Sequence, residues 1–215
     1  ESGPHIVRAS IETDYLDVDD QRHLAVDVRN ALRGLVVDGE PRDSARESET
    51  YAFTLALDPT GEGFHFSTDV KTAELFSAEG LEAYDFLVLA NVQAVAPEKV
   101  EKIEQFVRRG GGLLLTMGPR VDRVLFNRDF WNGGRGLSPA QLGEVAGSAP
   151  EGELERGVER RIGRFAAEHP VFRTFREKLR AAIYDLVFYK YFRTKDFALE
   201  KVLASFDDDL QSPAF

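Results

Sequence analysis

A strand, helix, strand pattern from Tyr84 to Asp122 constrains the fold of this chain more than any other feature. Phe86 to Ala90 and Leu113 to Thr116 are apolar runs of strand length. Between them lies a segment whose apolar residues share one helical face: Val100, Ile103, Phe106 and Val107. Pro97 suits the first turn of that helix, and Gly110 suits the left-handed position that ends it. Because both strands are continuously apolar, we expect a parallel sheet that helices cover on both faces.

Earlier segments extend the same alternation of strands and helices. We expect strands at Gly34 to Val37 and Phe64 to Val70, a helix from Glu47 to Leu57 that Ser44 caps, and a short helix from Ser77 to Ala83. In the longer helix, we expect the following side chains to face inward: Tyr51, Thr54, Leu55 and Leu57. This order predicts an α/β fold with a doubly wound, mainly parallel sheet and helices on both faces.

The two ends of the chain are less regular. His5 to Ile11 and His23 to Arg29 predict a β-hairpin with an acidic link, and Asp207 to Asp209 predicts a solvated turn. Beyond Pro119 we expect helices and strands in this order: helices Val121 to Trp131 and Ser138 to Leu142, an edge strand within Glu153 to Arg164, a helix from Val171 to about Arg180, and strands Ile183 to Phe192 and Leu199 to Phe206. We therefore divide the chain into a hairpin, residues 1–33, and an α/β domain, residues 34–215.

Composition excludes several classes of function. With 27 Lys and Arg against 37 Asp and Glu, the net charge of −10 disfavours nucleic acid and anionic membrane surfaces as partners. No apolar run is long enough to span a bilayer and no signal peptide opens the chain, so we expect a soluble piece. The chain has no cysteine, and its histidines have no metal-ligand spacing: His5, His23, His65 and His169. We expect neither a metal nor a cofactor.

Three strand ends indicate where a site would lie. Asp38, Asn91 and Met117 each follow a buried strand of the sheet, and open α/β sheets bind ligands at the carboxyl ends of their strands. The residues that we expect to line a pocket there are Asp38, Glu40, Asn91, Thr116, Met117, Gly118 and Arg120. A second interpretation stays open, in which Asp38 and Asn91 cap loops and Met117 fills the hollow.

Several segments in the same order resemble the class I glutamine-amidotransferase-like domain. They are Leu35 to Pro41, Tyr84 to Val92, Phe106 to Gly118 and Glu168-His169-Pro170. The version that is most similar occurs in bacterial membrane-anchored proteins that also carry von Willebrand factor A domains, the aerotolerance-regulator type. Gly3 to Ser10 and Asp17 to Arg29 resemble the end of the β-sandwich that precedes the domain there. The resemblance covers essentially the whole chain and implies an extracytoplasmic location.

The resemblance also implies that the nucleophile is missing. In catalytic members a cysteine follows the strand that is here Leu113 to Thr116, and Met117 matches its position. A thioether has no proton to lose and cannot attack a carbonyl. We expect Thr116 to point away from Met117, because neighbouring side chains of a strand face opposite sides. His169 resembles a His-Pro element of related proteins, but we expect it to bond locally at a helix start.

We therefore expect a non-catalytic interaction or scaffold module that is a piece of a longer protein and whose partners are proteins or neighbouring domains. The alternative is a small-molecule sensor or a hydrolase that uses carboxylates such as Asp38 and Glu40. A third hypothesis is that residues 1–33 mediate homodimerisation, which a truncation starting at Gly34 would test.

Overall fold

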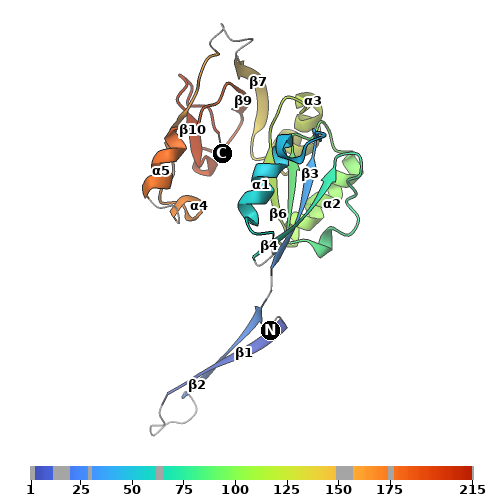
Figure 1. Cartoon of the computed structure of the whole chain (residues 1–215), viewed down its shortest axis with the longest axis vertical. Helices are drawn as coiled ribbons and strands as arrows, with labels where there is room; N and C mark the ends of the chain where they lie inside the picture. Colours follow the sequence, from blue (N-terminus) through green and yellow to red (C-terminus); the bar gives the residue numbers. More distant parts are fainter. Residues whose placement is uncertain are drawn as a thin grey trace.

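The computed structural model describes residues 3–11, 20–28, 31–61, 65–148, 157–173 and 177–214. The chain forms three parts: an N-terminal hairpin, a central α/β body and a C-terminal part built from short strands and helices (Figure 1). The hairpin projects away from the other two parts, and the C-terminal part lies beside the central sheet (Figure 1).

The hairpin consists of β1 (Gly3–Ser10) and β2 (Gln21–Val28), paired antiparallel with Gly3 opposite Val28 and Ser10 opposite Gln21. The two predicted strands are therefore confirmed, whereas most of the acidic link lies outside the described residues. In this register Val7 and Leu24 are opposite each other, and they are 54% and 64% exposed. The hairpin thus presents an uncovered apolar face.

Four parallel strands form the central sheet, in the order β4-β3-β5-β6. The strands are β3 (Leu32–Asp38), β4 (Phe66–Thr72), β5 (Phe86–Ala90) and β6 (Gly112–Thr116). The helices of this part are α1 (Glu49–Leu57) and α2 (Pro97–Arg108), with 3-10 turns η1 (Ala45–Glu47) and η2 (Leu81–Ala83). The α/β character and the strand, helix, strand unit are confirmed, and Phe64 of the expected strand Phe64 to Val70 lies outside the described residues.

Each face of the sheet has its own helix. Leu35 and Leu87 point to the face where α2 inserts Ile103 into the main hydrophobic core. Asp38 points to the other face, where it meets the start of α1. At its C-terminus α2 ends as expected, because Gly110 has φ 98° and its N–H bonds to the carbonyl of Val107.

The edge position of β6 corrects one expectation. Leu114 is 42% exposed and Thr116 is also exposed, so the strand Leu113 to Thr116 is not covered on both faces. Its residues alternate because Leu113 and Leu115 pack against the main core, whereas Gly112, Leu114 and Thr116 face the other way and are exposed. Continuous apolar sequence here does not mean a central strand.

Local details of the first helices also differ from the expectations. Ser48, not Ser44, caps α1, since its hydroxyl accepts a bond from the N–H of Thr50. Leu55 is exposed rather than inward-facing. The helix expected from Ser77 to Ala83 is reduced to the single turn η2.

After the central sheet the chain forms small elements. The first group comprises α3 (Arg123–Phe126), the π-helical turn η3 (Asn127–Trp131) and η4 (Asn132–Gly134), in agreement with the expected helix Val121 to Trp131. The second group comprises β7 (Gln141–Gly147), β8 (Ile162–Phe165), α4 (Pro170–Arg173), α5 (Glu177–Tyr184), β9 (Lys190–Lys195), η5 (Leu199–Lys201) and β10 (Ala204–Phe206).

Three expectations for this region are wrong. The expected helix Ser138 to Leu142 is no helix, and its last two residues begin β7. The first residues of the expected strand Ile183 to Phe192 belong to α5, and those of the expected strand Leu199 to Phe206 form η5. The reason is long-range pairing, since β7 pairs antiparallel with β9 and β8 with β10. Residues 149–156 and 174–176, which interrupt two of the expected elements, lie outside the described residues.

The C-terminal part has a second hydrophobic core, separate from the main one. Ile162, Phe165 and Phe206 are its centre, and Phe165 packs edge-on against Phe172 at 5.3 Å between ring centroids.

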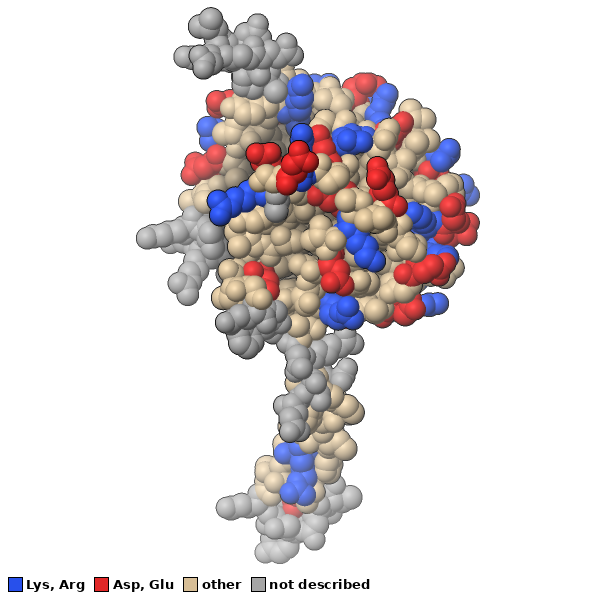
Figure 2. Space-filling model, turned by 45° about the vertical axis from the view of Figure 1, so that its right-hand side comes forward, with Lys and Arg blue, Asp and Glu red and all other residues tan. Residues whose placement is uncertain are grey.

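Positive and negative side chains are interspersed on the face shown in Figure 2, with no extended basic patch there. None of the helices in the described ranges is long and apolar enough to cross a membrane.

Candidate functional site

The carboxyl edge of the sheet brings the expected residues into one region. Asp38, Ala90 and Thr116 are side by side in the register of β3, β5 and β6, and Asn91 and Met117 each come one residue later. The strand order reverses here, because β4 and β5 flank β3 on opposite sides. Such a switch point is where open α/β sheets place ligands.

Asp38 is bound on all sides by its own chain. It is 4% exposed, and its Oδ2 accepts bonds from Ser48 Oγ at 2.5 Å and Thr50 Oγ1 at 3.3 Å. The N–H of Glu40 donates to its Oδ1 at 2.9 Å. The carboxylate therefore holds the start of α1 and the loop after β3 in place, as buried charges do when they are stable.

Asn91 links three segments through one amide. It is fully buried and has φ 51°, a left-handed conformation that asparagine tolerates. Its Nδ2 donates to Glu49 Oε1 at 2.7 Å and to Glu40 Oε2 at 3.1 Å, while Oδ1 accepts from the N–H of Arg120 at 2.9 Å. The loops after all three strands are thus joined at this side chain.

Main chain and small residues fill the crevice at the switch point. The N–H of Gly39 donates to the carbonyl of Ala90 at 2.8 Å, and a Cβ on Gly39 would lie 2.1 Å from the carbonyl oxygen of Asn91. A Cβ on Gly118 would lie 2.3 Å from Asn91 Cγ. Gly39 and Gly118 therefore permit a close contact that leaves no room for a ligand between these loops.

Met117 lies beside this network, at an open cleft. Its side chain is 37% exposed and lines a cavity of about 860 Å³ between β6 and the C-terminal part. Most of the other lining residues are apolar; they include Leu114, Val145, Phe192, Phe206 and Pro213. We call this cavity the β6 cleft. Met117 does not fill a closed hollow.

The seven expected pocket residues therefore fall into two groups. Asp38, Glu40 and Asn91 belong to the hydrogen-bond network, which Arg120 joins through its backbone while its side chain is exposed. The others line the β6 cleft: Thr116, Met117 and Gly118. Thr116 and Met117 both line the cleft, as do the strand neighbours Leu114 and Leu115, so the opposite directions expected for Thr116 and Met117 stay a prediction.

The sequence did not predict the other residues of the hydrogen-bond network or the far wall of the β6 cleft. Ser48, Glu49 and Thr50 complete the network, and the signal for them was a serine directly before a helix with a glutamate after it. The far wall of the cleft comes from β7, β9 and β10. Nothing local marks those residues, because they reach β6 only through the pairing of distant strands.

Chemistry at Thr116 would need a base that its hydroxyl contacts. Asp129 lines a small cavity together with Thr116, but Arg128 donates to both oxygens of its carboxylate at 2.7 Å. The Thr116 hydroxyl makes no hydrogen bond within the part of the chain that the structure describes, and a threonine nucleophile requires such a partner. His169 bonds locally as expected, since its Nδ1 accepts from the N–H of Val171 at 3.3 Å. Over the described ranges, no group of three or more potential metal ligands occurs.

A second buried carboxylate lies in the C-terminal part. Asp208 is buried, so the expectation of a fully solvated turn is wrong for this residue; it accepts bonds from Tyr191 Oη, Ser212 Oγ and the N–H of Ser212 at 2.9, 2.6 and 2.7 Å. Burial alone would raise the pKa of Asp208, but these bonds and the nearby Arg193 together lower it below its ordinary value. The pKa of Tyr191 is raised by burial and by its bond to Asp208. This network fastens the chain end to β9.

Comparison with known proteins adds no relative to this picture. Neither a protein family, nor a curated protein, nor a solved structure matched the chain.

Proposed function

We propose that this chain is a non-catalytic interaction module with a class I glutamine-amidotransferase-like, doubly wound α/β architecture. It belongs to an extracytoplasmic part of a membrane-anchored bacterial protein of the von Willebrand factor A, aerotolerance-regulator type. Its partners are other proteins or neighbouring domains of the same chain, and its hairpin, residues 1–33, continues a preceding β-sandwich or pairs with a second copy.

Strand order supports the architecture. If the parallel strands are numbered along the chain, their order is 2-1-3-4, which is the beginning of the flavodoxin-like doubly wound order. The resemblance of Leu35 to Pro41 and of Phe106 to Gly118 to amidotransferase-like domains falls on β3, on α2 and β6, and on the turns that follow the two strands.

One observation carries the non-catalytic assignment. At the carboxyl edge of the sheet, hydrogen bonds join Asp38, Glu40 and Asn91 to one another and to the start of α1, and the position that resembles the nucleophile holds Met117. The side chains of Asp38 and Asn91 form their hydrogen bonds with α1 and with the loops after the strands. The open surface beside them is apolar, which suits binding rather than proton transfer.

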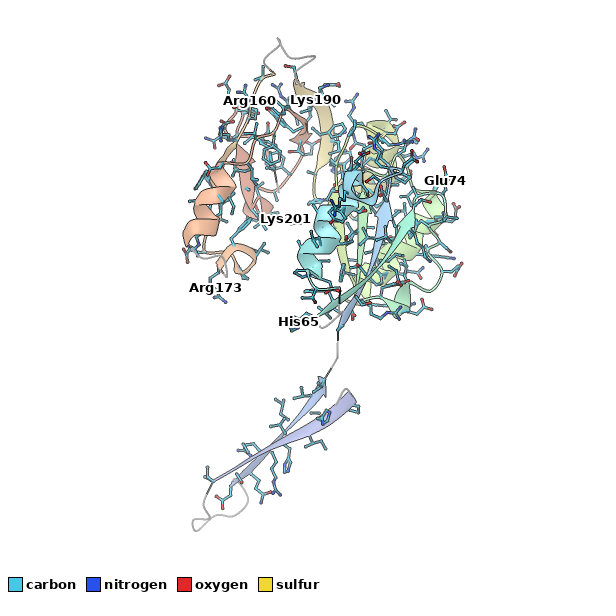
Figure 3. The ribbon with its side chains drawn as sticks, viewed as in Figure 1. His65, Glu74, Arg160, Arg173, Lys190 and Lys201 are labelled. Atoms are coloured by element: carbon cyan, nitrogen blue, oxygen red, sulfur yellow. The ribbon has the colours of Figure 1, made fainter. Side chains whose placement is uncertain are left out.

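A test of this assignment is a hydrolysis assay with L-glutamine and p-nitrophenyl acetate. We expect no protein-dependent release of ammonia or p-nitrophenol from the wild-type chain. A rate that Thr116→Val or His169→Ala removes would overturn the assignment. His65→Ala is the matched control, because His65 lies at the other end of the sheet, before β4 (Figure 3).

A second candidate is a small-molecule sensor that uses the β6 cleft. Its volume of about 860 Å³ falls within the range of ligand pockets, roughly 300–1,000 Å³, which favours this candidate. Asp38 and Glu40 do not belong to the described lining, so the cleft favours a sensor over a carboxylate-dependent hydrolase.

A further inference from the structure

We propose that the β6 cleft binds an extended segment of a partner protein, which adds to the open edge of β6 as a fifth strand of the central sheet. The segment has alternating apolar residues and carries at least one carboxylate. The inference rests on the proposed function as an interaction module and names the kind of partner that the module takes.

The backbone of β6 offers one unpaired side. The N–H of Gly112 bonds to Asp85 and the carbonyl of Thr116 accepts from Asn91, so alternate residues of β6 face β5. The backbone groups of Leu113 and Leu115 consequently face away from β5. No other strand in the described part of the chain pairs with β6. An unpaired edge of this kind is a template for strand addition.

The cleft has the size of a short strand. A residue within a sheet occupies about 160 Å³, from a strand spacing of about 4.8 Å, a sheet spacing of about 10 Å and a rise of about 3.3 Å. The cleft of about 860 Å³ therefore has room for about five such residues. The cleft lies along the second half of β6, because Leu114, Leu115 and Thr116 line it, and it continues along Met117, Gly118 and Pro119.

The walls suit alternating apolar side chains. Leu114 and Met117 stand on the sheet side, and Val145, Phe192 and Phe206 stand on the opposite side.

Charge selects a carboxylate on the partner. The charged side chains in the described lining are Arg123 and Lys190, with no Asp or Glu among them, although the whole chain has a net charge of −10. Arg123 is paired with Glu144 at 2.6 Å, so Lys190 supplies the charge that has no carboxylate partner among the described residues. Lys190 lies with Arg160 at the end of the C-terminal part farthest from the hairpin (Figure 3).

Backbone pairing distinguishes a strand from an amphiphile. A fatty carboxylate would satisfy the apolar walls and Lys190, but it would leave the outward N–H and C=O groups of Leu115, which lines the cleft, buried without partners, which is unfavourable. A strand satisfies the walls, the charge and the backbone together.

The test uses the full chain and a fluorescein-labelled nine-residue peptide of alternating valine and threonine with one terminal glutamate, followed by anisotropy. Two further peptides carry N-methyl groups on alternate residues, one set on the odd positions and one on the even positions. We expect one of the two to bind at least about tenfold more weakly than the parent, because its donors to β6 are lost. Equal binding of all three peptides, or no saturable binding of the parent, would overturn the proposal.

Variants locate the binding in the cleft. Leu114→Lys should weaken binding about tenfold or more, whereas Val124→Lys, at an exposed site outside the cleft, should leave it unchanged. Lys190→Glu should weaken the binding of the peptide that ends in glutamate. It should strengthen the binding of a peptide that has lysine instead of that glutamate. If Leu114→Lys and Val124→Lys changed peptide binding equally, the binding site would not be the cleft. The comparison of N-methylated peptides uses the wild-type chain, so it remains valid even if a variant fails to fold.

The result also separates this inference from the proposed function. A chain that binds no strand peptide and hydrolyses nothing would end the strand inference alone. A chain that hydrolyses glutamine or an ester through Thr116 or His169 would end the proposed function, whatever the peptides do.

Discussion

Asn91 is the residue on which the carboxyl edge of the sheet depends. Its amide joins Glu40, Glu49 and the backbone of Arg120, and its backbone is left-handed. Two carboxylates share the hydrogens of one neutral group, so the identity of this side chain decides whether the loops hold together. Glycine at positions 39 and 118 lets the surrounding chain approach it closely.

Replacing Asn91 with aspartate should destabilise the protein strongly. The change keeps the acceptor for Arg120 but places a third negative charge against Glu40 and Glu49 and removes their donor. We expect the free energy of unfolding to fall by about 2–4 kcal/mol at neutral pH. Urea denaturation measures this loss. Gln93→Glu, the matching change at an exposed position nearby, should alter stability by less than about 0.5 kcal/mol. Equal losses in the two variants would contradict this account of Asn91.

The pKa of Asp208 makes the stability of the C-terminal part depend on pH. Because the pKa of Asp208 is lowered in the folded chain, its contribution is fully present above the ordinary value of 3.8 and is lost as pH falls toward the folded pKa. Asp208→Asn should therefore be less stable than wild type by about 1–2 kcal/mol at neutral pH, with a smaller difference near pH 3.

Chemical denaturation at several pH values measures that difference. Asp209→Asn is the control, since Asp209 is the exposed neighbour of Asp208. A gap between wild type and Asp208→Asn that stays constant down to about pH 3 would show that the lowered pKa of Asp208 contributes nothing to folding.

At the scale of elements, α2 shows how the sequence specifies a boundary. The Gly110 N–H bonds to Val107 and the Gly111 N–H bonds to Phe106, a pair of contacts that needs the left-handed conformation at Gly110. Gly111 also lies against the Phe106 ring, where a Cβ would be 2.3 Å away. The glycines thus end the helix and allow β6 to start at once.

Substitution of Gly110 should weaken this boundary. At φ 98°, Gly110→Ala should cost about 1–2 kcal/mol of unfolding free energy, and Gly110→Asn should cost less, because asparagine tolerates left-handed angles better. Thermal or urea unfolding of both variants checks the order. Alanine and asparagine variants of equal stability would mean that the left-handed cap does not limit stability.

Elements with local signals were predictable and elements that depend on distant partners were not. The bounds of β5 follow from an apolar run. Those of α2 follow from a proline at its start, a stripe of apolar residues along one face and a glycine after its end. β7 was missed because its partner β9 is far along the chain, and the same pairing builds the far wall of the β6 cleft. The strand ends that hold Asp38, Asn91 and Met117 were foreseen, but not that a filled crevice separates Asp38 from Met117.

At the scale of the whole molecule, the hairpin stands apart. β1 and β2 pair with each other and project from the body (Figure 1), and a two-stranded hairpin alone is marginal in water. Val7 and Leu24 lie on one face of it, uncovered. We therefore expect this face to be covered in solution by a second copy.

Truncation tests that expectation. A chain starting at Ala31, just before β3, should lose the concentration-dependent self-association that we expect for the full chain in analytical ultracentrifugation. Its melting temperature should change by less than about 2 °C, because the body does not depend on the hairpin. If both chains sediment as monomers, a second copy does not cover this face.

We propose that Met117 lies in a binding cleft rather than in a catalytic or closed site. Met117 is the only methionine of the chain, so the ¹³C-methyl signal of labelled methionine reports on the cleft, and Met117→Leu assigns it even if an initiator methionine is added. The account predicts that this signal shifts and saturates when the valine–threonine peptide with a terminal glutamate is added, and stays unchanged with L-glutamine. A methionine signal that does not shift when the peptide is added would contradict the proposal of a binding cleft. So would a signal that shifts with L-glutamine while ammonia is released.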